Sequence, residues 1–396
     1  MSVDDRPTLS APDDDPWLWL EEVEGARALD FVEQQNRLTL DKFGGAAFER
    51  DTNNLASIYD RSDNIPYVSR SDGLLYNLWK DATNPRGVWR RTTIAEFRKA
   101  KPSWETLLDI DKLAADEGED WLVNGISSQP GRSRAILNLS RGGSDATTLR
   151  EFDTDTKSFV ADGFVLPEAK GGADWLDADT LVLSSAYGAD MATTSGYART
   201  IRLWRRGQPI EQAEVIFETS ADSMRVYAGV DHTASSPRTW IIDQVDFFNF
   251  AIWLRDARGA MTKLDLPTDV WMQAHGDWFA IKLRKTWSIN GRTFEADSVL
   301  GISLSAFLEG SRDFAVLFEP GPRRALQGLF WSAGKLVLPI LDDLRPVFEI
   351  CTPSPSGWSR EKLGGLPDIG VVDVWRLDNH ESESNGDLLA LSLIHI

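Results

Sequence analysis

The phrase Gly73-Leu-Leu-Tyr-Asn-Leu-Trp79 places a turn residue before a short apolar run, and similar phrases return along the chain. The other copies are Asp120-Trp-Leu-Val-Asn-Gly-Ile126, Asp179-Thr-Leu-Val-Leu-Ser-Ser185, Arg238-Thr-Trp-Ile-Ile-Asp-Gln244, Asp277-Trp-Phe-Ala-Ile-Lys-Leu283, Gly334-Lys-Leu-Val-Leu-Pro-Ile340 and Asp387-Leu-Leu-Ala-Leu-Ser-Leu393. They begin 39 to 59 residues apart, about 52 on average. Because one propeller blade of four short strands occupies roughly 40 to 50 residues, each copy predicts one blade.

Further strand patterns lie between these phrases. They are short segments rich in β-branched and aromatic residues: Thr200–Trp204, Glu214–Glu218, Asn249–Leu254 and Phe314–Glu319. A single four-stranded sheet cannot bury both of its faces, whereas sheets stacked around an axis bury them mutually and protect their edges. We therefore predict an all-β fold, a seven-bladed β-propeller.

The seventh copy comes very late in the sequence. After Asp387 only nine residues follow, and a blade needs about four strands of about five residues. We therefore expect the last blade to be incomplete by about two strands, as in a truncated reading frame.

The first part of the chain has a different pattern. Residues 1–14 are polar and acidic, and we expect a disordered tail. Ala28, Leu29, Phe31 and Val32 follow Gly25, and a second apolar face lies between residues 48 and 59, so helices are predicted in both stretches. The expected organisation is a tail at 1–14, a helical arm at 15–62 and the propeller at 63–396.

Composition places the chain among globular proteins. It has 396 residues, of which 42% are hydrophobic and 26% charged, with a net charge of −19. That acidic balance disfavours nucleic-acid and anionic-membrane partners, and no stretch has the pattern of a signal peptide or a membrane helix. The single cysteine, Cys351, excludes an internal disulfide and suggests a reducing, cytoplasmic location. Its neighbour Ile350 favours a buried, inert thiol.

Tryptophan is abundant, with 16 residues. Such rings either form a sugar-binding platform or fill the space between sheets. Because many of them stand inside predicted strands, core packing is the favoured interpretation.

No catalytic motif is found in the sequence. The pentapeptide Gly-x-Ser-x-Gly of α/β-hydrolases is absent, and the segments at Gly131–Ala135 and Gly301–Ser305 each fail at the last position. Asp153-Thr-Asp155 lacks the glycine and glutamate of a calcium loop and is expected to be a surface turn. No glycine pair begins a phosphate-binding loop.

The four histidines, His232, His275, His380 and His395, lack zinc-site spacing, and His275 is expected in a turn. We therefore predict no catalytic residue, no cofactor and no metal ligand.

Three segments carry a family resemblance. Asp15-Pro-Trp-Leu-Trp-Leu-Glu-Glu22, followed by Phe31-Val-Glu-Gln-Gln-Asn36, resembles the opening of prolyl oligopeptidase-family serine peptidases. Asp174–Leu181, with Ser195–Gly207, resembles their propeller, as does Phe307–Gly310 leading to Phe314–Pro320. The similarity runs in order from about residue 15 to about residue 390.

The resemblance implies a propeller that admits short peptides to an α/β-hydrolase domain with a Ser/Asp/His triad, which cuts after proline. No position of this chain matches the triad motifs, so the chain alone is expected to be inactive. Two other functions stay open: a stand-alone propeller that binds or scaffolds partners, and a propeller glycosidase, which would need clustered carboxylates with raised pKa values.

Overall fold

The computed structural model describes residues 15–22 and 24–393. The chain divides into two units, one made of residues up to 64 with residues 81–83, and one made of residues 65–80 with all those from 84 onward. The predicted tail at 1–14 and His395 lie outside the described residues.

The first unit is helical. It contains η1 (Leu18–Glu21), α1 (Ala26–Phe43) and α2 (Ala46–Tyr59). Gly44 and Gly45 separate α1 from α2 and serve as their C-cap and N-cap. The helices predicted around 25–36 and 48–59 are present, and α1 continues to Phe43 because Leu38, Leu40 and Phe43 extend its apolar pattern.

An aromatic cluster joins η1 to α1. The rings of Trp17, Trp19 and Phe31 lie 5.6 to 6.0 Å apart, and Trp19 meets Phe31 edge to face. Trp17 is nevertheless 48% exposed. The three rings therefore pack on one another without forming a buried core.

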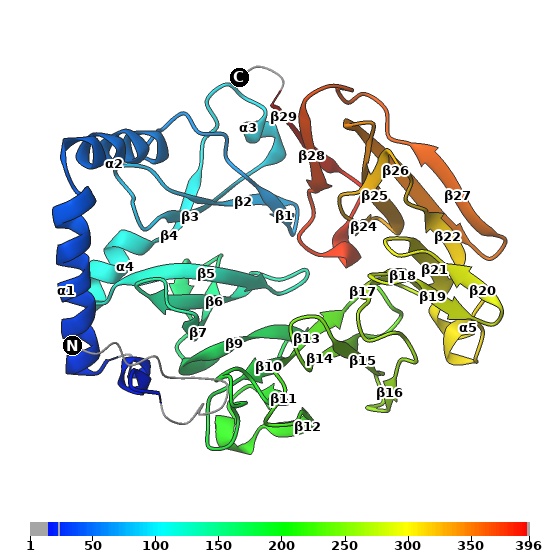
Figure 1. Cartoon of the computed structure of the whole chain (residues 1–396), viewed down its shortest axis with the longest axis horizontal. Coiled ribbons are helices and arrows are strands. Elements are labelled where there is room, and N and C mark those ends of the chain that lie inside the picture. Colours follow the sequence, from blue (N-terminus) through cyan, green and yellow to red (C-terminus); the bar gives the residue numbers. More distant parts are fainter. Residues whose placement is uncertain (1–14, 23, 394–396) are drawn as a thin grey trace. The chain divides into compact units, whose positions relative to one another are not determined.

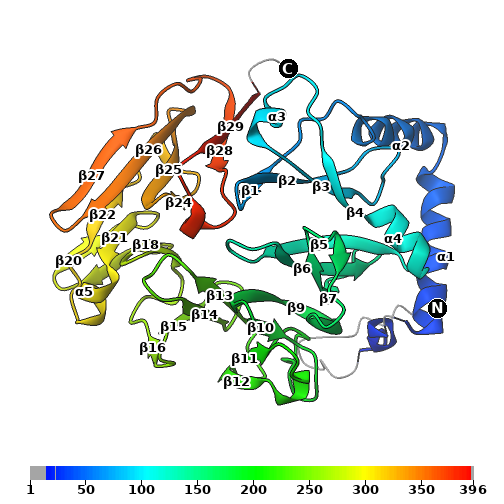
Figure 2. The same cartoon turned by 180° about the vertical axis from the view of Figure 1, so that it is seen from behind.

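The second unit consists mainly of antiparallel sheets that follow one another in chain order around a common centre (Figures 1 and 2). The first sheet contains β1 (Ser69–Ser71), β2 (Leu74–Trp79), β3 (Val88–Thr92) and β4 (Glu105–Asp109). An eight-stranded sheet contains β5 (Trp121–Ser128), β6 (Arg134–Arg141), β7 (Ala146–Asp153), β8 (Ser158–Phe159), β9 (Val165–Asp177), β10 (Thr180–Ser185), β11 (Thr200–Arg205) and β12 (Glu214–Glu218).

Four-stranded sheets follow in the middle of the unit. One contains β13 (Arg225–Asp231), β14 (Arg238–Gln244), β15 (Phe250–Arg255) and β16 (Met261–Lys263), and the next contains β17 (Trp271–His275), β18 (Trp278–Lys282), β21 (Val299–Ser303) and β22 (Ala315–Phe318). A separate hairpin is formed by β19 (Trp287–Ile289) and β20 (Arg292–Phe294).

The last two sheets differ in size. Five strands form one of them: β23 (Arg324–Leu326), β24 (Phe330–Ser332), β25 (Lys335–Asp342), β26 (Arg345–Ser354) and β27 (Gly357–Lys362). The other pairs β28 (Val371–Arg376) with β29 (Leu388–Leu393). Short helices connect strands: α3 (Ile94–Phe97), α4 (Ile110–Glu117), η2 (Ile210–Gln212), α5 (Leu304–Leu308) and η3 (Glu381–Glu383).

These sheets confirm an all-β, propeller-like fold with few helices. The additional strands predicted between the phrases are present as β11, β12, β15 and β22. The repeated phrase falls on β2, β10, β14, β18, β25 and β29, and each of these strands pairs with the strand just before it in the chain. The copy at Asp120 is an exception, because it forms β5, an end strand of its sheet. A turn residue before an apolar run marks any strand, so the pattern alone could not give the position within the sheet.

Apolar side chains fill the space between neighbouring sheets. In one cluster Leu317 and Phe318 of β22 pack with Leu336 and Leu338 of β25, and all four are almost fully buried. Cys351 belongs to the same cluster and is 1% exposed, and burial raises the pKa of its thiol. The expectation of a buried cysteine is therefore confirmed.

Tryptophan side chains also fill the space between sheets. Five of these side chains are buried in the core: Trp89, Trp121, Trp175, Trp204 and Trp331.

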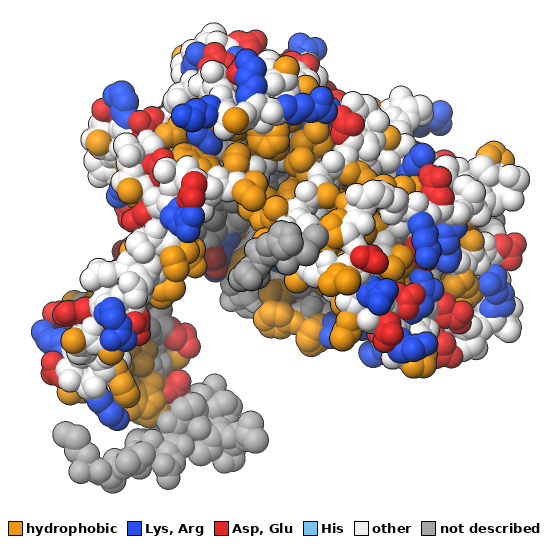
Figure 3. Space-filling model, turned by 90° about the horizontal axis from the view of Figure 1, so that it is seen from above, with side chains coloured by type: hydrophobic (Ala, Val, Ile, Leu, Met, Phe, Trp, Pro, Cys, Tyr) orange, Lys and Arg blue, Asp and Glu red, His pale blue; other side chains and the backbone are white. Residues whose placement is uncertain are grey.

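On the surface, acidic and basic side chains are interspersed over the face drawn in Figure 3. The helices in the described part of the chain include none with the length and hydropathy of a membrane span.

Candidate functional site

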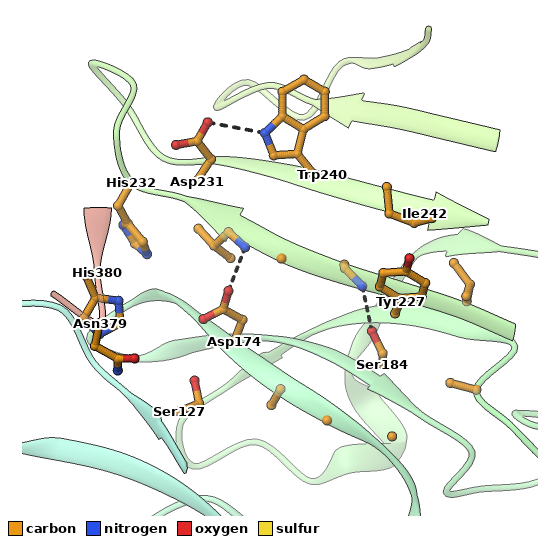
Figure 4. A pocket seen from close by; sticks show the side chains of 18 of the residues that line it. Ser127, Asp174, Ser184, Tyr227, Asp231, His232, Trp240, Ile242, Asn379 and His380 are labelled. Atoms are coloured by element: carbon orange, nitrogen blue, oxygen red, sulfur yellow. Dashed lines mark hydrogen bonds between the residues drawn. The ribbon is translucent and has the colours of Figure 1, made fainter. Parts of the chain in front are cut away.

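A cavity of about 1040 Å³ lies inside the second unit. Its wall includes residues of β5, β9, β13 and β17, which come from successive parts of the chain, together with residues 376–382. Figure 4 shows part of this wall. β13 and β17 are end strands of their sheets, and consecutive residues of β13, from Arg225 to Asp231, line the cavity.

One end of the wall is basic and aromatic. Arg225 and Tyr227 come from β13 and Lys170 from β9. Lys170 Nζ lies 4.4 Å from the ring centre of Tyr197, and the Arg225 guanidinium carbon lies 5.0 Å from that of Tyr227. Such contacts orient cations over aromatic faces.

The other end of the same strand is acidic. The Asp231 carboxylate accepts hydrogen bonds from Thr233 and from Arg238, whose Nε lies 2.9 Å from Oδ2. Burial on its own would raise the pKa of Asp231, but these donors and the Arg238 charge outweigh it and lower the pKa. Asp174 holds the neighbouring strand, because its Oδ2 accepts from Val230 N at 2.8 Å.

A loop between β28 and β29, residues 377–387 and here called the cross-sheet loop, contacts several sheets. The Glu381 carboxylate accepts from Gly334 N at 2.9 Å, in the turn between β24 and β25, and lies 3.3 Å from His275 Nε2. Glu383 Oε2 accepts from Asp72 N at 3.2 Å, in the turn between β1 and β2. The loop thus ties the last sheet to parts of the chain that are distant in sequence.

Two of the histidines lie at the cavity. His380 Nε2 is 3.0 Å from Ser128 Oγ, and Asn379 Nδ2 donates to the same hydroxyl at 2.7 Å. His232 Nε2 lies 2.8 Å from the carbonyl oxygen of Trp175. Burial lowers the pKa of His380, although the charges of Glu383 and Asp174 oppose this. In the described part of the chain no carboxylate hydrogen-bonds to His380, so the Ser128 and His380 pair lacks the third group of a triad.

Sequence reasoning did not connect these groups. His232 and His380 are 148 positions apart and show no motif, so no local signal could have placed them at one cavity. The expectation that His275 stands in a turn is wrong. His275 is the last residue of β17. Its ring stacks on the indole of Trp331, with the two ring centres 5.4 Å apart.

The rejected motifs occupy ordinary structural positions. Gly301 and Ser303 lie in β21, and the segment continues into α5. Ser303 Oγ caps α5 and donates to Asp277 Oδ2 at 2.7 Å. Asp153 is the last residue of β7 and is buried, and the turn predicted for this segment begins at Thr154, which is buried too. Among the described residues no group of three or more His, Cys, Asp or Glu side chains could hold a metal ion.

The fold and the cavity together define a propeller-like domain with a polar central cavity. Residues 10–280 match the model of the prolyl oligopeptidase N-terminal β-propeller domain. The chain belongs to this family.

Curated relatives agree with this assignment. The chain is 30% identical to an uncharacterized peptidase of Sinorhizobium fredii, over 96% of the chain and 54% of that protein. It is 26% identical to an uncharacterized peptidase of Rickettsia prowazekii, over 92% of the chain and 53% of that protein. The chain therefore spans about half the length of these relatives.

Solved structures are also similar. A post-proline cleaving enzyme from Rickettsia typhi matches with a TM-score of 0.82 and 26% identity, over 90% of this chain and 54% of that one. Oligopeptidase B from Leishmania major matches with a TM-score of 0.68 and 12% identity, over 92% of this chain and 50% of that one, a likeness of fold alone.

Proposed function

We propose that this chain is the propeller part of a serine endopeptidase that cleaves short peptides after proline. One observation carries the proposal: the chain matches the Rickettsia typhi post-proline cleaving enzyme over 90% of its own length but over 54% of that enzyme. In the proposal the other half supplies the Ser, Asp and His groups and the oxyanion hole. Because that chemistry needs all these groups in one place, the chain by itself is inactive.

The proposed architecture is a seven-bladed ring over residues 63–396, preceded by the arm at 15–62. Six blades would be formed by the sheets up to β27, and β28 with β29 would form half of the seventh. The contacts of Asp72 and Gly334 with the cross-sheet loop support a ring in which the last blade touches the first and the sixth. The single, buried Cys351 supports a cytoplasmic location.

The cavity has the role of a size filter in this proposal. Its volume of about 1040 Å³ suits a short peptide, and the wall belongs to well-packed strands. A folded protein does not fit such a space, whereas an extended peptide does.

The arm has the role of a docking element for the catalytic half. Large apolar side chains of α1 and α2 are exposed: Leu29, Val32, Leu38, Leu40, Phe43, Phe48, Leu55, Ile58 and Tyr59. The two helices thus leave much of their apolar surface uncovered, as is typical of an interaction surface. A glycosidase is disfavoured, because it would need carboxylates with raised pKa values and Asp231 at this cavity has a lowered one.

The test is hydrolysis of succinyl-Gly-Pro-p-nitroanilide, with the alanine analogue as the matched substrate. The purified chain alone is expected to release no nitroaniline above the uncatalysed rate. A chimera that joins this chain to the second half of the Rickettsia typhi enzyme is expected to hydrolyse the proline substrate and to prefer it over the alanine substrate.

Two results would contradict the proposal. One is turnover by the chain alone that survives repeated purification. The other is a folded chimera, verified by circular dichroism, that shows no preference for proline.

A further inference from the structure

The charged side chains of the cavity wall differ between the two ends of strand β13. Arg225 is the first residue of β13 and Asp231 is the last, so about 20 Å separates them at the usual rise of a strand. In Figure 4 Tyr227 lies toward one end of the drawn wall, and His232, His380 and Asn379 lie toward the other. A ligand along this wall therefore meets cations at one end and, at the other, Asp174 and the ion pair of Asp231 with Arg238.

The cations at the basic end have little competition from protein carboxylates. Arg225 Nε donates to the neutral Gln244 Oε1 at 2.7 Å, and in the described residues no carboxylate forms an ion pair with Arg225. Lys170 Nζ is 3.8 Å from Asp145 Oδ2, but the Asp145 side chain is 72% exposed. Because an exposed pair of this kind contributes little, Lys170 is also available to a ligand.

One aromatic ring lies beside both of these cations. Tyr197 lies beside both, 4.4 Å from Lys170 Nζ and 5.9 Å from the Arg225 guanidinium carbon, measured to its ring centre. Gln244 fixes the Nε side of the guanidinium, so its terminal nitrogens remain as donors. A planar fork of donors beside an ammonium is the arrangement that binds a carboxylate in two-point fashion.

We infer that Arg225, Lys170 and Tyr197 form a carboxylate-binding site for peptides in the cavity. The inference rests on the proposed function, since it names the class of peptide that the cavity takes. The carboxylate comes from the C-terminus of a short peptide or from an acidic side chain. The peptide's other end then points toward Asp174 and the ion pair of Asp231 with Arg238.

Binding of peptides to the purified chain tests the site without any catalysis. The probes are acetyl-Ala-Pro-Ala-Ala with a free carboxylate, the same peptide as its C-terminal amide, and an amide in which glutamate replaces the last alanine, each titrated by calorimetry. We expect the free carboxylate to bind about tenfold or more tightly than the plain amide, as a charge-assisted hydrogen bond implies. Tight binding of the glutamate amide would show that side-chain carboxylates are accepted too.

Substitutions test which residues bind the carboxylate of the peptide. Arg225→Gln is expected to lower the affinity of the free carboxylate to that of the amide, and Lys170→Gln to weaken it several-fold. Arg205→Gln is the matched control, because Arg205 is exposed and does not line the cavity. Circular dichroism and urea unfolding verify that each variant is folded.

The inference is overturned if acid and amide bind equally, if neither binds, or if Arg205→Gln weakens binding as much as Arg225→Gln. These outcomes are separate from the peptidase proposal. A chain that binds carboxylates while its chimera lacks proline preference would retain the site and lose the proposed function.

Discussion

Arg70 illustrates at the residue scale how a single side chain joins distant parts of the chain. Its Nε and Nη2 donate to both oxygens of Asp378 at 2.6 and 3.0 Å, and Nη1 donates to Asp387 at 2.7 Å. The hydrogen bonds with Asp378 and Asp387 raise the pKa of Arg70, so it is always charged. The backbone of Arg70 also bonds to Leu377 and Asn379, which places β1 directly beside the cross-sheet loop.

We predict that Arg70→Gln lowers the free energy of unfolding by about 3 kcal/mol, because it leaves the buried Asp378 without its cation. The Asp378 side chain is only 3% exposed. Urea unfolding at pH 7 measures the effect. Arg61→Gln is the control, since the Arg61 and Asp63 pair is exposed, and it is expected to leave stability unchanged. An equal loss in both variants would refute the argument.

We expect His380 to make the stability of the chain depend on pH. Burial lowers its pKa in the folded chain, against the opposing charges of Glu383 and Asp174 and with help from His232. The unfolded chain therefore binds a proton first, so stability is complete above the ordinary histidine pKa of about 6.5 and falls as pH drops below it.

We expect the free energy of unfolding to decrease between pH 7 and pH 5, and His380→Asn to reduce this decrease. One such group contributes at most about 1.4 kcal/mol per pH unit. Urea unfolding at pH 7, 6 and 5 gives the slope for both proteins. Identical slopes would mean that His380 does not carry the dependence.

At the scale of elements, β9 is the strand that crosses between two groups of strands. Its residues up to Lys170 pair with β7, and its residues from Gly171 pair with β10. Gly171 has φ +148°, and a Cβ there would lie 2.0 Å from the carbonyl oxygen of Ser184. Only glycine fits this position, because both the backbone angle and the close approach exclude a side chain.

Gly171→Ala is therefore expected to destabilise the chain by at least about 2 kcal/mol, through strain and displaced pairing of β10. Gly172→Ala is a closely matched control, because Gly172 has an ordinary φ and open space at its Cβ position. Thermal and urea unfolding compare the two. Similar stability of both variants would show that β9 does not need the glycine.

The glycine turns that open two of the repeated phrases have the backbone geometry of hairpin turns. Asp72 and Gly73, like Ala333 and Gly334, both have positive φ and form two-residue hairpin turns before β2 and β25. The glycine that opens each of these two phrases is thus part of the turn that sets the register. The Asp120 copy could not be distinguished locally, because it has the same turn residue and apolar run as the other copies, although its strand β5 is an end strand that pairs with the following strand β6.

At the scale of the whole molecule, the two units differ in how far their large apolar side chains are buried. The strand unit buries large apolar side chains between sheets, such as Trp175 and Trp331, whereas the arm leaves Leu38, Phe43 and Tyr59 exposed. The chain spans about half the length of its relatives, and in our proposal the other half covers the arm.

The sequence by itself determined the strands, the hairpin turns, the arm helices and the family, because apolar period, turn chemistry and motif order are local properties. The tertiary structure alone decided the ion pair of Arg70 with Asp378, the burial of His380, and the gathering of Lys170 and Arg225 beside Tyr197. These groups come from segments tens to hundreds of positions apart. Sequence spacing carries no record of such contacts, since they exist only after the sheets have packed around the cavity.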